Sequence, residues 1–336
     1  MDFLIESALK VLVVFGVLLG CVAYTTLLER KLLGRIQVRL GPNRVGPFGL
    51  LQPVADGLKF FFKEDIVPGN VDKPVFILAP ILALVPAICI VAVIPFGPKI
   101  SLFGREIYLR ITDINIGILY ILALSGIGAY GTMLGGWASN NKYGLLGSMR
   151  SAAQTISYEL AMGLVLVSIV MMAGSLSLSA IVATQAKYWN VFFQPVAFVL
   201  FIIAGLAEIN RTPFDMPEAE AELACGFNIE YSSMKFALFF MAEYAHMISL
   251  AALTTCLFLG GWTLPFGWDN LPVLAAVPKV LWFLGKVFCL VFFFIWERGT
   301  FPRLRYDQIM TLGWKWMMPI AILNLVVTGV VLTVYG

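Results

Sequence analysis

Residues 236–261 read FALFFMAEYAHMISLAALTTCLFLGG, an apolar run long enough to cross a membrane as a helix. Two ionisable side chains, Glu243 and His246, interrupt this run. A charge at the centre of a bilayer costs about 2.5–3.5 kcal/mol on insertion scales, so such residues usually face a wet or paired protein interior. The run therefore predicts a transmembrane helix that carries a polar site inside a helical bundle.

The rest of the chain has the same apolar character. Its 336 residues are 60% hydrophobic and 13% charged, and its mean hydropathy is +0.88, whereas soluble domains have about 25% charged residues. Eight stretches are apolar enough to span a membrane: 11–28, 74–96, 115–137, 151–174, 191–207, 236–262, 278–296 and 317–334. We expect an all-α integral membrane protein of about eight transmembrane helices, with residues 1–336 forming a single membrane domain.

Lysine and arginine are distributed unevenly among the connections. Four connections hold 16 of the 23 basic residues, and we call them the inward loops: 29–73, 138–154, 208–235 and 297–316. The N-terminus and the other connections hold six, and Lys286 lies inside a span. The positive-inside rule predicts that both termini face outward. The small net charge of +3 does not indicate a nucleic-acid surface.

The first inward loop contains an amphipathic pattern after a run of Gly, Pro and Asn turns. Apolar residues recur at helical spacing: Leu51, Val54, Leu58, Phe61 and Phe62. Polar residues fall on the opposite side: Gln52, Asp56, Lys59 and Lys63. The pattern predicts an amphipathic helix in the membrane interface, and the alternative is a helix that packs on the bundle without binding a ligand.

The third inward loop is unusually acidic. Residues 208–230 read EINRTPFDMPEAEAELACGFNIE and hold six of the chain's 20 acids: Glu208, Asp215, Glu218, Glu220, Glu222 and Glu230. Asp215 and Glu218 have the spacing of a helix N-cap, with Pro217 in the first turn and Gly226 as a stop. The sequence predicts a short acidic helix over about 216–225, and a solvated acidic turn is the alternative.

Other carboxylates lie in or beside apolar stretches. Glu29 lies at the end of the first span, Glu159 lies near the start of the fourth span and Glu243 lies inside the sixth span. Neighbouring buried carboxylates cannot all ionise, so they titrate as a coupled set and can relay protons. Lys286 is the candidate counter-charge.

Metal and redox centres are not expected in this chain. Glu243 and His246 form an E-x-x-H pair, but a di-iron site needs a second such pair, and His246 is the only histidine. A lone histidine is more often a packing residue than a proton carrier. The five cysteines lie singly, without a C-x-x-C pair. Any redox centre must therefore belong to another chain.

Five segments closely resemble one family, the H-type membrane subunits of proton-translocating NADH-quinone oxidoreductase, respiratory complex I. The segments are ERKLLGRIQVRLGPNRVGPFGLLQPVADGLKFFFKED (29–65), SMRSAAQTISYELAMG (148–163), AEINRTPFDMPEAEAELACGFNIEYSS (207–233), FFMAEYAHM (239–247) and WERGTFPRLRYDQIMTLGWKWMMP (296–319). They include every inward loop. His246 is the one departure from what the resemblance implies.

The resemblance implies a subunit of an enzyme and proton translocase, without a redox centre of its own. Electrons from NADH reach a quinone, such as ubiquinone, through FMN and iron–sulfur clusters of partner subunits. The implied role of this chain is to dock the peripheral arm, help to form the quinone chamber and contact other membrane-arm subunits and lipid. The implied location is the energy-transducing membrane, here the bacterial plasma membrane with periplasmic termini.

The resemblance also implies roles for individual residues. The quinone chamber and its access path would include Arg30, Arg35, Leu51, Val54, Asp56, Leu58, Lys59, Phe61, Arg211, Phe214 and Asp215. The proton path would include Glu29, Glu159, Glu208, Glu218, Glu220, Glu222, Glu230 and Glu243. For Arg211 a loop-stapling ion pair is the alternative. The basic residues Arg298, Arg303 and Arg305 of the last inward loop, with Asp307, are expected to dock or pack.

Two other functions are compatible with part of the pattern. The ion-translocating anchor subunit of a membrane-bound hydrogenase or formate hydrogenlyase is related, but the intact amphipathic helix and the basic first loop disfavour it. The second alternative, from a different functional class, is a secondary transporter that works without partner subunits. The absence of internal sequence repeats disfavours it.

Overall fold

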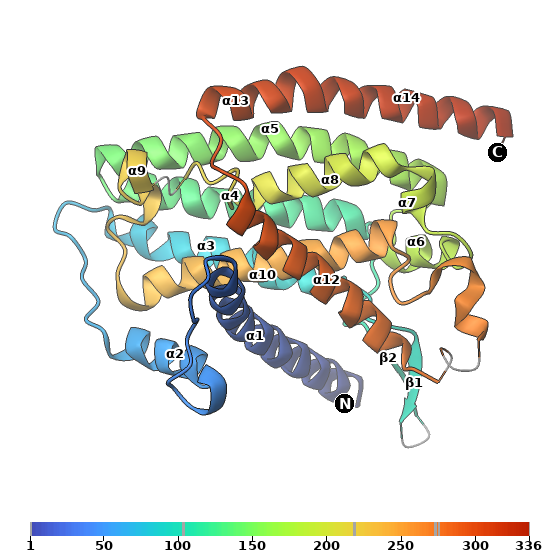
Figure 1. Ribbon diagram of the computed structural model, residues 1–336, viewed down its shortest axis with the longest axis horizontal. Coiled ribbons are helices and arrows are strands. Elements are labelled where there is room, and N and C mark those ends of the chain that lie inside the picture. The colour runs from blue at the N-terminus through green and yellow to red at the C-terminus, as the bar shows by residue number, and fades with distance from the viewer. Residues whose placement is uncertain (1, 103–104, 218–219, 272–273, 275, 336) are drawn as a thin grey trace.

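The computed structural model describes residues 2–102, 105–217, 220–271, 274 and 276–335, and over these the chain is a bundle of helices with one short hairpin (Figure 1). The long helices are α1 (Asp2–Ile36), α3 (Lys73–Val91), α4 (Gly117–Ala138), α5 (Lys142–Ala173), α10 (Ser233–Phe258), α12 (Lys279–Thr300) and α14 (Met318–Tyr335). The shorter helices are α2 (Gln52–Phe62), α6 (Leu178–Thr184), α7 (Asn190–Phe193), α8 (Pro195–Glu208), α9 (Glu220–Leu223) and α13 (Tyr306–Thr311). The hairpin consists of β1 (Lys99–Leu102) and β2 (Arg105–Tyr108).

The membrane-spanning character of the fold is confirmed. Among the described residues, seven helical segments are long and apolar enough to cross a membrane, the last running through α13 and α14. The strands β1 and β2, which pair antiparallel between α3 and α4, were not predicted. They add only a short hairpin to an all-α membrane protein.

The fifth predicted span, residues 191–207, is shorter than expected. The helix breaks at Gln194, whose backbone is not helical, because the following Pro195 disfavours the helical conformation of its predecessor. α8 then has 14 residues, which is about 21 Å at 1.5 Å per residue, against a hydrocarbon core of about 30 Å. The shortening is at the N-terminal end of α8, whereas its last residue, Glu208, lies close to the predicted end of the span and is buried in the bundle.

The two ends of the bundle carry different elements. The N-terminus lies on the side of the hairpin and the C-terminus lies near α6 and α7, whereas α2 and α9 lie on the opposite side (Figure 1). Successive long helices run between these two ends, so the four inward loops gather at one of them. Their common location agrees with the alternation in basic residues on which the orientation was predicted.

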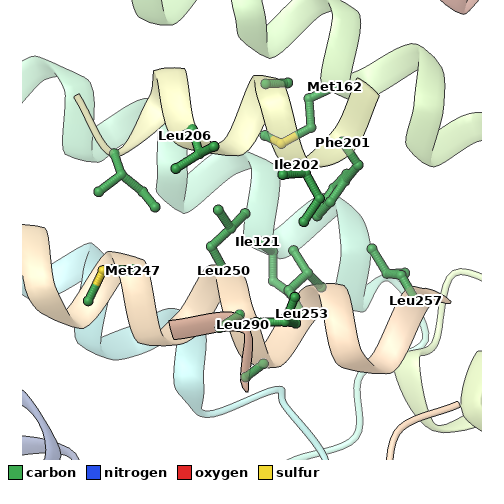
Figure 2. Close-up of a cluster of buried hydrophobic side chains, with 14 of the residues drawn as sticks. Ile121, Met162, Phe201, Ile202, Leu206, Met247, Leu250, Leu253, Leu257 and Leu290 are labelled. Carbon is green, nitrogen blue, oxygen red and sulfur yellow. The ribbon is translucent and has the colours of Figure 1, made fainter. Parts of the chain in front are cut away.

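A cluster of buried apolar side chains lies between α8 and α10 (Figure 2). Figure 2 shows Phe201, Ile202 and Leu206 of α8 pointing toward the apolar side chains of α10, and all of them are buried. A Cβ atom added at Gly205 would lie 2.4 Å from the Leu250 side chain, so the close approach of the two helices requires glycine. This contact positions Glu208, at the end of α8, beside the middle of α10.

The acidic helix is wrong in extent. α9 has four residues, and Met216 and Pro217, where the helix was predicted to begin, form a turn. Ala224 and Cys225 have φ of 49° and 77°, so the backbone leaves the helical region before Gly226. Glu218 lies outside the described residues, so the N-cap that was predicted from Asp215 and Glu218 falls outside them as well.

Candidate functional site

The chain between α8 and α9 is irregular and yet buried. We call residues 208–217 the acidic segment. Ile209, Arg211, Phe214 and Met216 are each 3% exposed, and Asp215 is 7% exposed. Non-helical backbone at membrane depth is tolerated where it is buried in protein or lines a cavity, because its polar groups need partners there. The acidic segment therefore brings charged side chains into the interior of the bundle.

Gln154 of α5 supports this segment. Its buried side-chain nitrogen donates to the carbonyls of Ala207 and Phe214, both at 2.7 Å, and lies 3.1 Å from Oδ1 of Asn210. The backbone N–H of Leu304 donates to the carbonyl of Pro213 at 3.1 Å. These bonds satisfy one carbonyl in the last turn of α8 and two carbonyls of the irregular acidic segment, none of which has a helical partner beyond Glu208.

Arg211 is the centre of a buried ion cluster. Its Nη1 lies 2.6 Å from Oε2 of Glu29 on α1, and its Nε lies 2.5 Å from Oε1 of Glu243 on α10. The guanidinium also lies over the ring of Tyr244, 4.2 Å from its centroid. Arg211 thus joins the acidic segment to two membrane helices, which is the loop-stapling pairing considered for it from the sequence.

The ion cluster is balanced in charge. Arg298 of α12 pairs with the other oxygen of Glu29, so two cations face two carboxylates. Burial by itself would lower the pKa of Arg211, but the carboxylates of Glu243 and Glu29 outweigh burial and raise that pKa well above its ordinary value. Arg211 therefore stays charged, and a change of proton occupancy in this cluster has to involve a carboxylate.

A second ion pair holds the other end of the segment. Nη2 of Arg303 lies 2.5 Å from Oδ2 of Asp215. Arg298 and Arg303 thus both contact the candidate site, and they do so as the packing charges predicted for the last inward loop. Arg305 pairs with Asp307 at 3.2 Å on the exposed surface.

Glu208 lies in a second polar site next to the ion cluster. Its partner His246 is one turn of α10 after Glu243. The Ser125 hydroxyl of α4 donates to Oε1 of Glu208, and Nε2 of His246 lies 3.3 Å from the same oxygen. These three residues line a cavity of about 780 Å³, part of it open to the exterior, to which Glu243 also contributes. The structure therefore brings Glu208 and Glu243, predicted from the sequence as path residues, to one cavity.

The remaining acids lie farther out. Glu159 is half-buried on α5 and close enough to Glu208 for their charges to interact. Glu222 pairs with Arg150 at 2.7 Å, and Glu230 accepts a hydrogen bond from Asn141 at 2.8 Å. The side chain of Glu220 lies outside the described residues.

Lys286 does not have the role expected for it. Its ammonium donates to the carbonyls of Leu259, Gly261 and Thr263, at 2.6–2.9 Å, at the C-terminal end of α10. Arg211 is the cation that contacts both Glu29 and Glu243, and Arg298 also pairs with Glu29. The two cations could not be ranked from the sequence because Arg211 lies in a loop and Lys286 in a span.

The residues predicted for quinone access form an exposed surface. α2 forms within the predicted amphipathic pattern, and the side chains of Leu51, Val54, Leu58 and Phe61 are 51–72% exposed. The polar side of α2 faces the bundle, where Arg30 pairs with Asp56 at 2.7 Å and Lys59 lies 4.0 Å from Asp56. Arg35, in the last turn of α1, is exposed. The structure thus separates these residues from Arg211, Phe214 and Asp215.

Sequence reasoning missed Ser125 and Gln154. Both are small or neutral polar residues in apolar stretches, and only the fold reveals their partners on the acidic segment. Among the described residues, no group of three or more His, Cys, Asp or Glu side chains is arranged to hold a metal ion. The chemistry of the site is therefore that of carboxylates, guanidinium groups and one imidazole.

Comparison with known proteins agrees with this architecture. The family model described as NADH dehydrogenase matches residues 9–329. The NADH-quinone oxidoreductase H subunit 1 of Geobacter sulfurreducens is 55% identical over 99% of this chain and 97% of its own length. Relatives of the same name from Paramagnetospirillum magneticum and Syntrophotalea carbinolica are 50% and 51% identical, over 99% and 97% of this chain and 94% and 96% of their own lengths. The chain therefore belongs to the NADH dehydrogenase family, among the H-type membrane subunits of NADH-quinone oxidoreductase, the respiratory complex I.

Proposed function

We propose that this complex I subunit forms part of the quinone chamber and couples quinone reduction to proton translocation through its buried glutamates. The observation that carries the proposal is the acidic segment, which lies inside the bundle and pairs with charged groups of α1, α10 and the connection between α12 and α13. Ordinary solvated loops do not hold ion pairs in the interior, since an unpaired buried charge is costly.

The coupling follows from the charge that quinone reduction creates. Taking up two electrons and two protons generates transient negative charge in a low-dielectric chamber, and nearby carboxylates respond strongly to it. Glu208 and Glu243 line one cavity, and Glu243 and Glu29 share Arg211. A proton gained or lost by one of these carboxylates changes the proton affinity of the others, so the set passes the change into the membrane.

Quinone access is proposed along α2 and the end of α1. A quinone has an apolar tail, and the exposed residues Leu51, Val54, Leu58 and Phe61 supply an apolar surface for it. Arg30, Arg35, Asp56 and Lys59 supply polar groups beside this surface. The same face suits the lipid interface, so α2 would lie where a quinone enters from the membrane.

Docking and orientation complete the proposal. The inward loops would contact the peripheral subunits, which carry the FMN and iron–sulfur clusters, and other faces of the single membrane domain would contact membrane-arm subunits. By the positive-inside rule the inward loops face the cytoplasm of a bacterial plasma membrane and both termini face the periplasm. The curated relatives favour this interpretation over a hydrogenase anchor or a stand-alone transporter.

The test uses the whole complex in native membranes. A strain lacking this chain is complemented with the natural sequence, with Glu208→Gln, or with Glu106→Gln as a matched control at an exposed hairpin position. Inhibitor-sensitive NADH-driven quinone reduction and proton translocation are measured. Glu208→Gln is expected to lower both rates about tenfold or more, because positioned proton-transfer groups contribute about 100-fold or more. Normal rates and an unchanged number of protons per NADH would refute the role of Glu208.

A further inference from the structure

His246 lies at the boundary between two cavities. Its Nε2 is 3.3 Å from Oε1 of Glu208, and the larger cavity of about 780 Å³ is lined by both residues and by Ser125. A second cavity of about 360 Å³, part of it also open to the exterior, is lined by the same three residues. The hydrogen-bonded group of Ser125, Glu208 and His246 therefore separates the two spaces.

The two cavities differ in character. The larger one is also lined by five further polar residues: Thr132, Thr155, Asn210, Asn228 and Glu243. It has both the room and the hydrogen-bond partners that water needs. The smaller one is lined mainly by apolar side chains of α3, α4, α5 and α10. The shared residues Ser125, Glu208 and His246 form the hydrogen-bonded contact between the polar and the apolar side.

Two of the shared residues are of types that act as proton donors and acceptors in general acid–base chemistry, the carboxyl of Glu208 and the imidazole of His246. The hydroxyl of Ser125 serves as a hydrogen-bond donor to Glu208. The charged groups around His246 are Glu208 of α8, Glu243 one turn away on α10 with its partner Arg211, and Glu159 of α5 beyond Glu208. α3 contributes only apolar side chains to the larger cavity, and α4 contributes Ser125 and Thr132 as its polar ones.

We propose that His246 is a proton carrier that exchanges a proton with Glu208 at the boundary between the two cavities. The proton leaves Nε2 of the imidazolium and binds Oε1 of the Glu208 carboxylate, which leaves a neutral imidazole and a neutral carboxylic acid. The imidazole is recharged by a proton from the larger cavity, so no other reactant is needed. The inference rests on the proposed function and adds one proton carrier to its carboxylates, the imidazole of His246.

The test compares His246→Gln with the natural chain in the assembled complex. Glutamine can hydrogen-bond to Glu208, but it cannot carry a proton at these pH values. Proton translocation and quinone reduction are measured from about pH 5.5 to 8.5, a range that brackets the ordinary imidazole pKa. The natural chain should show an inflection in this range that His246→Gln lacks, with translocation about tenfold slower in the variant at neutral pH. Ser249→Ala, one turn further along α10 on the smaller cavity, is the matched control and should keep the natural profile.

A second variant guards against a simple packing effect. His246→Ala opens space beside Glu208, and added free imidazole should restore translocation in it, which a loss of packing alone would not allow. His246→Gln with the natural rate and pH profile would overturn the proposal, and so would a His246→Ala complex that imidazole does not rescue. Loss of assembly in both variants would assign His246 to packing and overturn it as well.

Glu208→Gln, measured alongside, separates this proposal from the function on which it rests. Suppose that Glu208→Gln loses coupled activity while His246→Gln keeps the natural pH profile. This result would refute the proposed role of His246 and support that of Glu208. Natural behaviour of both variants would remove the proposed role of Glu208 too.

Discussion

The ion cluster around Arg211 and the ion pair between α1 and α2 have nearly the same geometry in very different surroundings. The Arg211–Glu29 contact is 2.6 Å between side chains that are 2% and 4% exposed. The Arg30–Asp56 contact is 2.7 Å between side chains that are 50% and 22% exposed. Glu29 and Arg30 are adjacent in sequence, so one peptide unit separates a buried carboxylate from a solvated cation.

The comparison teaches that burial decides what an ion pair contributes. Removing one partner from a buried pair leaves an uncompensated charge and costs about 3–5 kcal/mol. An exposed pair is screened by water and contributes about 0–1 kcal/mol. The first contact therefore determines whether the acidic segment can stay inside the bundle, whereas the second only adjusts the position of α2.

The largest effect is expected from Arg211→Met. The change leaves Glu29 and Glu243 without their shared cation, and the free energy of folding should become less favourable by about 3–5 kcal/mol. The amount of assembled complex and its thermal stability in detergent are the measurements. Adding Glu243→Gln should recover part of the loss, because it removes one stranded charge. Natural stability of Arg211→Met would contradict the energetic difference between the two regions.

The next effect concerns the apolar side of α2. Phe61 is 72% exposed, and if that face lies in lipid, Phe61→Ser weakens its partition by about 1.5–3 kcal/mol. The KM for quinones with long apolar tails should rise, and the KM for short-tailed quinones should change little. Lys63→Ser, on the polar side of the same helix, is the control. An equal change for both tail lengths would argue against an access path along α2.

Arg303→Met should have an intermediate effect. Arg303 is 40% exposed, but its partner Asp215 is 6% exposed, so the loss should be about 0.5–1.5 kcal/mol, the contribution of a typical hydrogen bond. Arg305→Met, in a pair whose side chains are 77% and 66% exposed, is the matched control and should be almost neutral. Both are measured as shifts in the thermal midpoint of the solubilised complex, and equal shifts would show that burial of Asp215 does not matter.

The smallest effect is expected from Arg30→Met. Its pair with Asp56 is exposed enough that the loss should stay below about 1 kcal/mol. The loss should also shrink at high salt, because exposed charges are screened over about 10 Å at 0.1 M ionic strength. Thermal midpoints at low and high salt test this. A loss as large as that of Arg211→Met would contradict the comparison.

Much of the fold could be predicted because hydropathy is a local property. The long apolar runs coincide with the helices α1, α3, α4, α5, α10, α12 and α14. The fifth run failed because its average hydropathy does not register one Gln–Pro step, which shortens α8. The acidic helix was overextended at its start, where Met216 and Pro217 form a turn, and at its end, where Ala224 and Cys225 leave the helical region before Gly226.

The candidate site could be predicted only in part. The acids were visible as charges in apolar surroundings, and this signal found Glu29, Glu208 and Glu243. It could not identify Ser125 or Gln154, which carry no charge, nor choose Arg211 over Lys286 as the buried counter-charge. Such choices depend on which elements pack together.

The sequence by itself determined that this protein is a helical membrane protein with acids in its interior and basic loops at one end, since residue type decides whether a segment partitions into a bilayer. It also determined the family, through long and unusual loop motifs. Only the tertiary structure decided which charges meet. Glu29 and Arg211 are 182 positions apart, and their ion pair exists because the acidic segment that follows α8 folds into the bundle, where low-dielectric burial forces every charge to find a partner.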